Sequence, residues 1–181
     1  MASGPRRGLA VTTMASRRQF IVALAGACSL GPIVVWLTGR SSTSASTGHA
    51  FPIQKSDAEW RKVLAPERYR ILRGHRTERS FTSPLNSEKR PGLFVCAGCG
   101  HPLFSSRTKF ESGTGWPSFW QPLEGAVGTE IDRSWLMVRT EVHCAQCGGH
   151  LGHVFDDGPE PTGLRFCMNG LALEFRAGSE A

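Results

Sequence analysis

The chain has 181 residues, 40% hydrophobic and 20% charged, a composition that excludes a disordered chain and a coiled coil. Its formal net charge of +6 is unevenly placed, because five of the 21 basic residues and none of the 15 acidic residues lie within residues 1–50. From Phe51 onward sixteen basic residues stand against fifteen acidic ones. This near-neutral balance gives no electrostatic basis for nucleic-acid binding.

Residues 1–50 have the three parts of an export signal. Arg17 and Arg18 stand just before an apolar run over residues 20–37, which is followed by the Ser/Thr/Ala-rich residues 41–50. Paired arginines before an apolar run are typical of a twin-arginine signal. The apolar run is also close to the shortest length that spans a membrane, so an uncleaved membrane anchor is the alternative. We therefore expect an exported protein, either periplasmic by the twin-arginine route or anchored to the membrane by this segment.

Residues 51–181 are predicted to form one domain that begins with short helices. Ser56 and Asp57 precede the amphipathic residues 58–64, and a Ser or Asp cap before such a run marks a helix start. The proline that follows either ends this helix or opens a second one over residues 66–72, since proline is favoured at the first helical position.

From Gly92 the chain changes to short runs rich in β-forming residues. Segments that contain glycine and proline separate these runs, as expected for strands joined by turns. The predicted strands are residues 93–95, 102–104, 134–139, 152–155, 164–167 and 171–175. Together with the helices they predict a mainly β (α+β) domain of small antiparallel sheets.

Two matched turns carry four of the six cysteines: Cys96 and Cys99 in one, Cys144 and Cys147 in the other, each pair followed by a glycine. Two residues between cysteines let one tight turn present both sulfurs to one ion, and two such turns make a tetrahedral four-thiolate zinc site. Two disulfides or a redox-active pair are the alternatives, but the matched spacing favours structural zinc. Such a site is closed, with no open position for catalysis at the metal.

Cys167 lies outside these pairs. On a strand, Arg165, Cys167 and Asn169 share one face, and a nearby guanidinium stabilises a thiolate. A lone cysteine in a strand is most often a small buried hydrophobic residue. Arginine, cysteine and asparagine together, however, make a poor core face, so Cys167 is the candidate nucleophile.

Two further motifs could act together with this cysteine. His150 and His153 are spaced so that they could share an ion, but no acidic ligand stands beside them. Next to a nucleophilic cysteine they become candidate proton donors. Residues 113–120 form a Gly-rich aromatic loop, which is either a hydrophobic lid over the core or a binding wall in which the Trp116 indole holds a small apolar group.

The order of these motifs resembles that of the B-type methionine sulfoxide reductases. The matching stretches are Cys96-x-x-Cys99, Gly115-Trp116-Pro117-Ser118-Phe119, Cys144-x-x-Cys147, His150-Leu151-Gly152-His153-Val154-Phe155 and Arg165-Phe166-Cys167-Met168-Asn169, together with Phe81–Leu85 and Pro102–Ser106. The resemblance covers about Trp60 to Phe175. It implies two small antiparallel sheets clipped by zinc, and an enzyme that reduces methionine R-sulfoxide at a site away from the metal.

The resemblance also assigns chemical roles. The Cys167 thiolate, favoured by Arg165, would attack the sulfoxide sulfur and become a sulfenic acid as methionine is released. The departing oxygen needs a proton or strong hydrogen bonds, which His150, His153 and Asn169 would supply. The biological role would be the repair of oxidised proteins.

The substrate and the reductant complete this reading. Trp116 would hold the substrate methyl group, with Phe119 and Phe166 as further substrate-binding residues, and the partners would be oxidised proteins or peptides and a thioredoxin-like reductant. Many members of the family carry a resolving cysteine where Thr114 stands. Threonine forms no disulfide with Cys167, so we expect an external thiol to reduce the sulfenic acid directly, or with help from a zinc-site cysteine.

Two rival classes fit less well. A zinc-ribbon binding or chaperone module would share the two cysteine turns, but it would not need Cys167 between Arg165 and Asn169. A zinc deaminase needs an open metal position and a His-x-Glu motif. This chain has neither at its cysteines.

Overall fold

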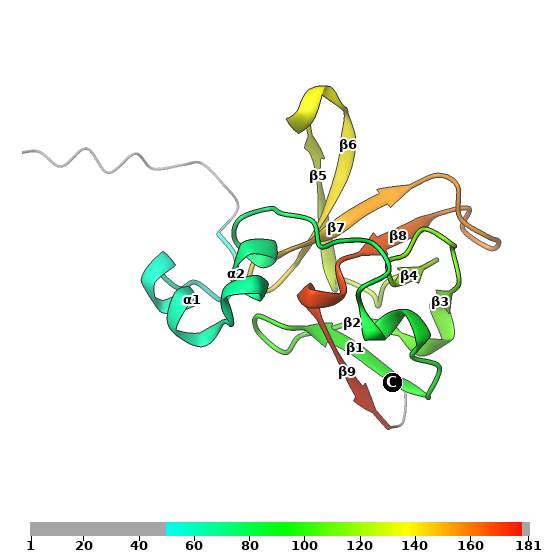
Figure 1. Ribbon diagram of the computed structural model, residues 1–181, viewed down its shortest axis with the longest axis horizontal. Coiled ribbons are helices and arrows are strands. Elements are labelled where there is room, and N and C mark those ends of the chain that lie inside the picture. Colours follow the sequence, from blue (N-terminus) through cyan, green and yellow to red (C-terminus); the bar gives the residue numbers. More distant parts are fainter. Residues whose placement is uncertain (1–49, 179–181) are drawn as a thin grey trace, which may run out of the picture. The chain divides into compact units, whose positions relative to one another are not determined.

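A computed structural model of the protein describes residues 50–178 (Figure 1). Two short helices precede strands that are arranged in two antiparallel sheets. The predicted export signal lies outside the described residues, apart from Ala50 at its end. Within the described range, no helix has both the length and the apolar content needed to cross a bilayer.

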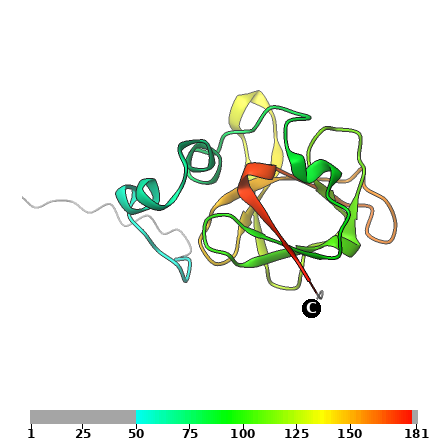
Figure 2. The same cartoon turned by 60° about the horizontal axis from the view of Figure 1, so that its bottom comes forward.

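Both predicted helices form where the sequence places their caps. Helix α1 (Asp57–Val63) starts with a capping box, in which the Glu59 backbone N–H donates to Ser56 Oγ and the Ser56 N–H donates to the Glu59 carboxylate. Helix α2 (Pro66–Leu72) has its proline at the first turn, where no donor is lost. Figure 2 shows the two helices on one side of the strands.

The smaller sheet has three strands in the order β2-β1-β9. They are β1 (Gly92–Cys96), β2 (Pro102–Ser105) and β9 (Leu173–Ala177). The central strand β1 ends at Cys96, and both neighbours run antiparallel to it. The strand predicted at residues 171–175 starts later than expected, at Leu173, because residues 171 and 172 belong to a single 3₁₀ turn, Gly170–Ala172.

The larger sheet has six strands in the order β3-β4-β8-β7-β6-β5, all antiparallel. They are β3 (Lys109–Phe110), β4 (Ser118–Phe119), β5 (Val127–Asp132), β6 (Arg139–Cys144), β7 (His150–Phe155) and β8 (Arg165–Met168). Central strands β7 and β8 carry the histidine pair and Cys167. Their register sets His153 directly opposite Cys167.

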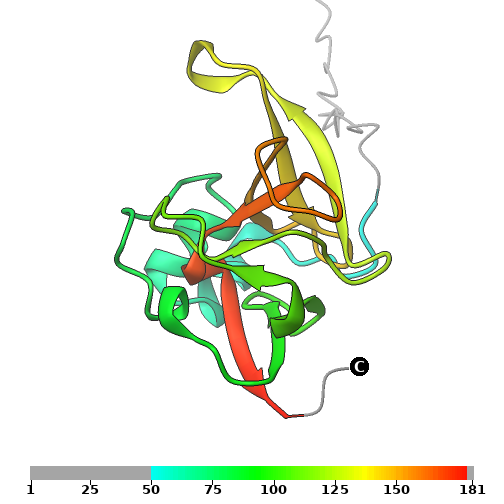
Figure 3. The ribbon, with the colours of Figure 1, turned by 90° about the vertical axis from the view of Figure 1, so that its right-hand side faces the viewer.

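The predicted strand at residues 134–139 is wrong. Ser134–Leu136 is a single 3₁₀ turn at the tip of the hairpin formed by β5 and β6, and only Arg139 belongs to a strand. The Asp132 carboxylate accepts the Ser134 backbone N–H at 2.8 Å, which favours a turn. Leu136 has a φ of 58° and a fully exposed side chain. Figures 1 and 3 show this hairpin extending away from the other strands.

Aromatic rings form the centre of the hydrophobic core. The Phe104 ring stacks on Phe119 with centroids 4.3 Å apart, and Phe94 meets Phe119 edge-on at 4.9 Å. All three side chains are fully buried. Because Phe94 and Phe104 belong to the smaller sheet and Phe119 to the larger one, this contact packs the two sheets together and fixes the strands that carry the site.

Candidate active site

A cavity of about 110 Å³ lies beside Cys167. It is lined by four of the predicted site residues, Trp116, His153, Cys167 and Asn169, together with Thr77, Arg139, Gly152 and Phe155. Strand β8 presents Cys167 to this cavity, while its neighbours Phe166 and Met168 are buried in the core. The alternation of side chains along β8 thus separates the reactive face from the packed one.

The surroundings of the Cys167 thiol act on its pKa in opposite directions. Burial raises the pKa, and Thr114, Arg165 and Ser118 lower it in part, with burial the larger effect. The Arg165 guanidinium makes two 2.8 Å hydrogen bonds to Asp157, so its charge is shared. The free enzyme therefore holds Cys167 mainly as a thiol at neutral pH, and a proton acceptor is needed for nucleophilic attack.

Three hydroxyl groups form a hydrogen-bonded chain that reaches the thiol. Thr114 Oγ1 lies 3.8 Å from Cys167 Sγ. Ser112 Oγ lies 2.8 Å from Thr114 Oγ1 and 2.7 Å from Ser118 Oγ, which is fully buried. Thr114 thus places a hydroxyl within reach of the nucleophile, as part of a hydrogen-bonded chain.

The surroundings of His153 favour its neutral form. Its Nε2 lies 2.9 Å from Asp132 Oδ2, which also accepts a hydrogen bond from Arg139 at 2.7 Å. Burial lowers the pKa of His153, and the hydrogen bond to Asp132 offsets only part of this shift. Since a carboxylate only accepts, Nε2 carries the hydrogen, and in the neutral ring Nδ1 is the nitrogen that can accept a proton.

His150 lies in an adjoining, larger cavity of about 770 Å³, which shares Thr77, Arg139 and His153 with the cavity at Cys167. His150 Nδ1 is 2.6 Å from Glu141 Oε1, and the side chains are 3% and 6% exposed. His75 Nδ1 lies 3.1 Å from the same carboxylate oxygen. The structure thus places the two predicted histidines on one continuous cleft, with only His153 beside Cys167.

The cluster of His75, Glu141 and His150 has the donor atoms of a metal site, all within 4.8 Å of one another. Ligands of a tetrahedral zinc ion at bonds of about 2.1 Å lie roughly 3.4 Å apart. The 2.6 Å between His150 Nδ1 and Glu141 Oε1 is instead a short hydrogen-bond distance. The distances therefore favour a hydrogen-bonded cluster over a metal centre.

The backbone of Glu78 makes hydrogen bonds to two side chains that line the Cys167 cavity, Asn169 and Trp116. The Glu78 backbone N–H donates to Asn169 Oδ1 at 2.9 Å, and its carbonyl accepts the Trp116 indole N–H at 3.2 Å. The Glu78 carboxylate accepts the backbone N–H groups of Gly170 and Leu171. Because the Asn169 amide nitrogen also donates to a backbone carbonyl, one of its two hydrogens remains for a ligand.

Two predicted substrate-binding residues do not line this cavity. Phe119 is fully buried against Phe104, and Phe166 is 7% exposed with its ring 6.0 Å from Phe104. The period-two alternation of β4 and β8 turns both rings toward the core. The structure thus gives both rings a packing role, and their part in substrate binding stays a prediction.

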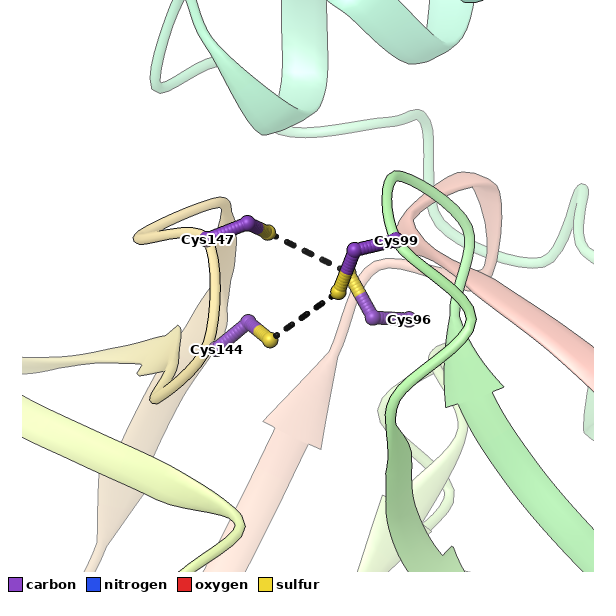
Figure 4. Close-up of side chains that lie close together, drawn as sticks. All are labelled: Cys96, Cys99, Cys144 and Cys147. Carbon is purple, nitrogen blue, oxygen red and sulfur yellow. Dashed lines mark hydrogen bonds between the residues drawn. The ribbon is translucent and has the colours of Figure 1, made fainter. Parts of the chain in front are cut away.

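The four paired cysteines form a second centre, in which the sulfur atoms point toward one another (Figure 4). Cys96 Sγ lies 3.8 Å from Cys147 Sγ, and Cys99 Sγ lies 3.6 Å from Cys144 Sγ. Disulfide sulfurs would be about 2.05 Å apart. Four sulfurs around one tetrahedral ion, with bonds of about 2.3 Å, lie about 3.8 Å apart. The cluster therefore fits a metal ion and not two disulfides.

Four acidic residues of the site were not identified from the sequence: Glu78, Asp132, Glu141 and Asp157. Each is distant in the chain from the group it contacts or lies in a segment without a recognisable motif. Strand pairing is the signal that could have found Asp132 and Glu141. The turn at Cys144–Cys147 folds β7 back on β6 and sets Glu141 opposite His153, and the pairing of β5 with β6 sets Asp132 opposite Arg139.

Comparison with known proteins identifies the family. Residues 64–177 match the SelR domain. A peptide methionine sulfoxide reductase MsrB from Leptospira interrogans serogroup Icterohaemorrhagiae serovar Lai is 55% identical over 127 residues, which cover 70% of this chain and 97% of the relative. An MsrB protein from Agrobacterium fabrum is 56% identical over 68% of this chain and 92% of the relative. One from Methanosarcina barkeri is 52% identical over 71% of this chain and 91% of the relative. The chain belongs to the MsrB family of peptide methionine sulfoxide reductases and is an oxidoreductase.

Proposed function

We propose that the protein reduces methionine R-sulfoxide, in oxidised proteins or peptides or as the free amino acid, to methionine. The observation that carries this proposal is the placement of Cys167. Among the five cysteines that the structure describes, it alone lies outside the metal cluster, and it opens onto a cavity with Trp116, His153 and Asn169. The preference for the R epimer rests on the resemblance to the B-type enzymes.

The proposed reaction transfers the sulfoxide oxygen to Cys167. His153 Nδ1 takes the thiol proton, and the resulting thiolate attacks the sulfoxide sulfur. The attack forms a bond between the Cys167 sulfur and the substrate sulfur. This bond and the sulfur–oxygen bond of the substrate then break as the oxygen, which carries the proton taken from the thiol, bonds to the Cys167 sulfur, so that the products are methionine and the Cys167 sulfenic acid. Methionine sulfur is thereby reduced by two electrons and Cys167 is oxidised by two. The remaining Asn169 N–H and the histidines stabilise negative charge on the departing oxygen.

The size of the two cavities suits a side chain that is attached to a polypeptide. The cavity at Cys167 is small, and the Trp116 indole offers an apolar wall for the substrate methyl group. The adjoining larger cavity is open to solvent and leaves room for flanking residues. Repair of oxidised proteins is therefore the biological role that we propose.

A turnover assay with both sulfoxide epimers tests the function. The R and S forms, each free and within a short peptide, would be incubated with the protein and dithiothreitol, and methionine would be quantified. We expect turnover of the R epimer only. Turnover of the S epimer alone, or of neither form by a folded protein, contradicts the proposal.

We further propose that the ion held by the four cysteines is a structural zinc ion. Four thiolates suit zinc, and the sulfur separations match its tetrahedral geometry. A closed set of four ligands leaves no position for substrate, so the ion would supply stability and no chemistry. The residues that act on the substrate belong to the separate cavity at Cys167.

Recycling of the enzyme is expected to depend on an external, thioredoxin-like thiol. The Thr114 hydroxyl oxygen lies 3.8 Å from Cys167 Sγ, and threonine cannot form a disulfide. After one turnover with stoichiometric methionine R-sulfoxide and no reductant, the Cys167 sulfenic acid should persist and react with a sulfenic-acid trapping reagent. Mass spectrometry of the intact protein measures the trapped adduct.

Substitutions at the same position provide the comparison. Thr114→Cys should lose the trapped adduct and gain a disulfide to Cys167, since the side chains already meet. Thr114→Val is the matched control that adds no thiol and should keep the adduct. A disulfide between Cys167 and one of the clustered cysteines, with release of metal, would instead show that a metal ligand resolves the sulfenic acid.

We also propose that residues 1–50 direct export by the twin-arginine route. Changing Arg17 and Arg18 to lysine should abolish export, because the export machinery reads the paired arginines and not their charge. Changing the other pair, Arg6 and Arg7, to lysine is the matched control and should leave export intact. Fractionation of cells that produce each variant measures the result. Export that survives the change at Arg17 and Arg18 removes the twin-arginine route.

A further inference from the structure

We propose that a hollow beside the Cys167 cavity, lined by three arginines, binds an acidic side chain of the oxidised polypeptide close in sequence to its methionine sulfoxide. This arginine hollow has a volume of about 500 Å³ and is lined by helix α2, residues 76–82 and Leu171. Its arginines are Arg70, Arg76 and Arg79. The inference rests on the proposed reduction of methionine sulfoxide and adds a specificity subsite to it.

The charges of these three arginines are not used by the fold. All three side chains are exposed, and within the described part of the chain none has a side-chain hydrogen bond or ion pair with another residue. Neighbouring arginines are occupied: Arg68 binds the Glu174 carboxylate, and Arg73 donates to the Cys147 carbonyl. Guanidinium groups bind carboxylates through charge-assisted, often paired hydrogen bonds. A hollow that gathers three of them is therefore suited to a carboxylate ligand.

The acidic residues of the hollow do not cancel this charge. The Glu78 side chain is buried, and its carboxylate accepts the backbone N–H groups of Gly170 and Leu171. Glu67 is exposed and, among the residues that the structure describes, forms no ion pair. One exposed carboxylate thus stands against three guanidinium groups, so the surface of the hollow is positive and attracts anions.

The segment that carries Arg76 and Arg79 is held in place before any ligand binds. The Arg76 backbone N–H donates to the Arg70 carbonyl at 3.2 Å, which brings these two backbones together. At the other end, the Phe81 N–H donates at 2.7 Å to a carbonyl of the Gly-rich loop. His75 and Phe81, on either side of the segment, have φ values of 49° and 63°, a left-handed backbone that residues with a side chain rarely adopt. A backbone fixed in advance lowers the entropy that binding costs.

Thr77 connects the arginine hollow to the site of reaction. It lines the hollow, the cavity at Cys167 and the larger adjoining cavity. The next residue, Glu78, accepts the Trp116 indole N–H through its carbonyl. A polypeptide whose methionine sulfoxide enters the cavity at Cys167 therefore meets the arginines within a few residues, since an extended chain advances about 3.3 Å per residue. This continuity favours a side chain of the substrate over an independent anion.

The test compares short peptides with a central methionine R-sulfoxide and either Glu or Gln at one flanking position, on each side in turn. Both ends are capped, so the side chain is the only carboxylate, and dithiothreitol is the reductant. We expect Glu on one side to lower KM roughly 3- to 10-fold relative to Gln, as for a few partly exposed ion pairs. The kcat values of the two peptides should be equal. Raising the salt concentration to about 0.5 M should remove the difference, because salt screens exposed charges.

Substitutions in the hollow assign the effect to its arginines. Arg70→Gln, Arg76→Gln and Arg79→Gln should each reduce the ratio of the KM values for the Gln and Glu peptides, measured within the same variant. Arg79→Glu should reverse the preference, so that a peptide with Lys at this position gains over Glu. Arg176→Gln is the matched control, because Arg176 is an exposed arginine on β9 that does not line the hollow. This control should keep the ratio of the unmodified protein.

A binding measurement separates this subsite from the proposed function. Calorimetric titration of Cys167→Ser protein with the same peptides needs no turnover, and the Glu peptide should bind more tightly than the Gln peptide. Equal KM and Kd values for the two peptides, or a preference that survives removal of all three arginines together, overturns the subsite. Arginine variants that change only the KM for a thioredoxin-like reductant would assign the hollow to the reductant and also overturn it. Failure of the unmodified protein to reduce any peptide would overturn the proposed function, while the titration would still decide whether the hollow binds the acidic side chain.

Discussion

Replacing Cys167 by serine is expected to lower sulfoxide reduction by more than about 1,000-fold, as for loss of an enzyme nucleophile. The serine oxygen is smaller than the sulfur it replaces, so the side chain fits the same space, but it cannot take up the substrate oxygen because only sulfur reaches the sulfenic acid state. The fold should survive, since the packed face of β8 is formed by Phe166 and Met168 and is unchanged. Turnover of methionine R-sulfoxide with dithiothreitol measures the loss.

The chain offers a matched control for this change. Cys28 is the other cysteine outside the two Cys-x-x-Cys turns, and Cys28→Ser should keep wild-type turnover. Metal content and the thermal melting curve of Cys167→Ser should match those of the unmodified protein. Wild-type turnover by Cys167→Ser would show that another group is the nucleophile and would remove the assignment of the site.

Local signals predicted most of the fold that holds this site. The capped segment at Ser56 and the proline at residue 66 both start helices as expected. Strands β1, β2, β7 and β8 also lie where β-forming residues cluster between glycines and prolines. These elements are short and carry their own start and stop signals, so a single sequence is enough to place them.

The hairpin of β5 and β6 was missed because its strands are polar. Val127–Asp132 and Arg139–Cys144 hold few apolar residues, because β5 is partly exposed and β6 buries the polar Glu141 beside Val142. The apolar run at residues 134–138 lies instead at the tip, where Leu136 is fully exposed. Hydrophobic pattern identifies strands that bury a face, and here the run did not belong to such a strand.

In the candidate site, too, the contacts within one strand were predictable from the sequence and the contacts across strands were not. Period-two alternation along one strand is enough to bring Arg165 and Cys167 to one face, and the structure places Asn169 in the same cavity. The contact between Glu141 and His150 spans a hairpin turn and depends on its register. A register is set by pairing across strands, which a reading of each strand by itself does not supply. The acidic partners of both histidines therefore came only from the structure.

Removing one ligand of the cysteine cluster is expected to destabilise the whole domain. Cys96 ends β1 of the smaller sheet and Cys144 ends β6 of the larger one, so one ion would clamp the two sheets. Structural zinc contributes on the order of 10 kcal/mol in small domains, which is comparable to the entire stability of a typical domain. Cys144→Ser should therefore unfold the protein or lower its Tm by more than about 10 °C.

The measurements are the thermal melting curve and the zinc content per chain, for Cys144→Ser and for the unmodified protein after treatment with a chelator. We expect one zinc per chain in the unmodified protein and loss of the folded baseline when zinc is removed. Cys167→Ser is the matched control, because it also removes one thiol but leaves the cluster intact. A zinc-free protein with an unchanged melting curve and full turnover would contradict the structural role. Destabilisation by Cys144→Ser and not by Cys167→Ser would show that the four clustered thiols hold the two sheets together while the fifth is free for chemistry.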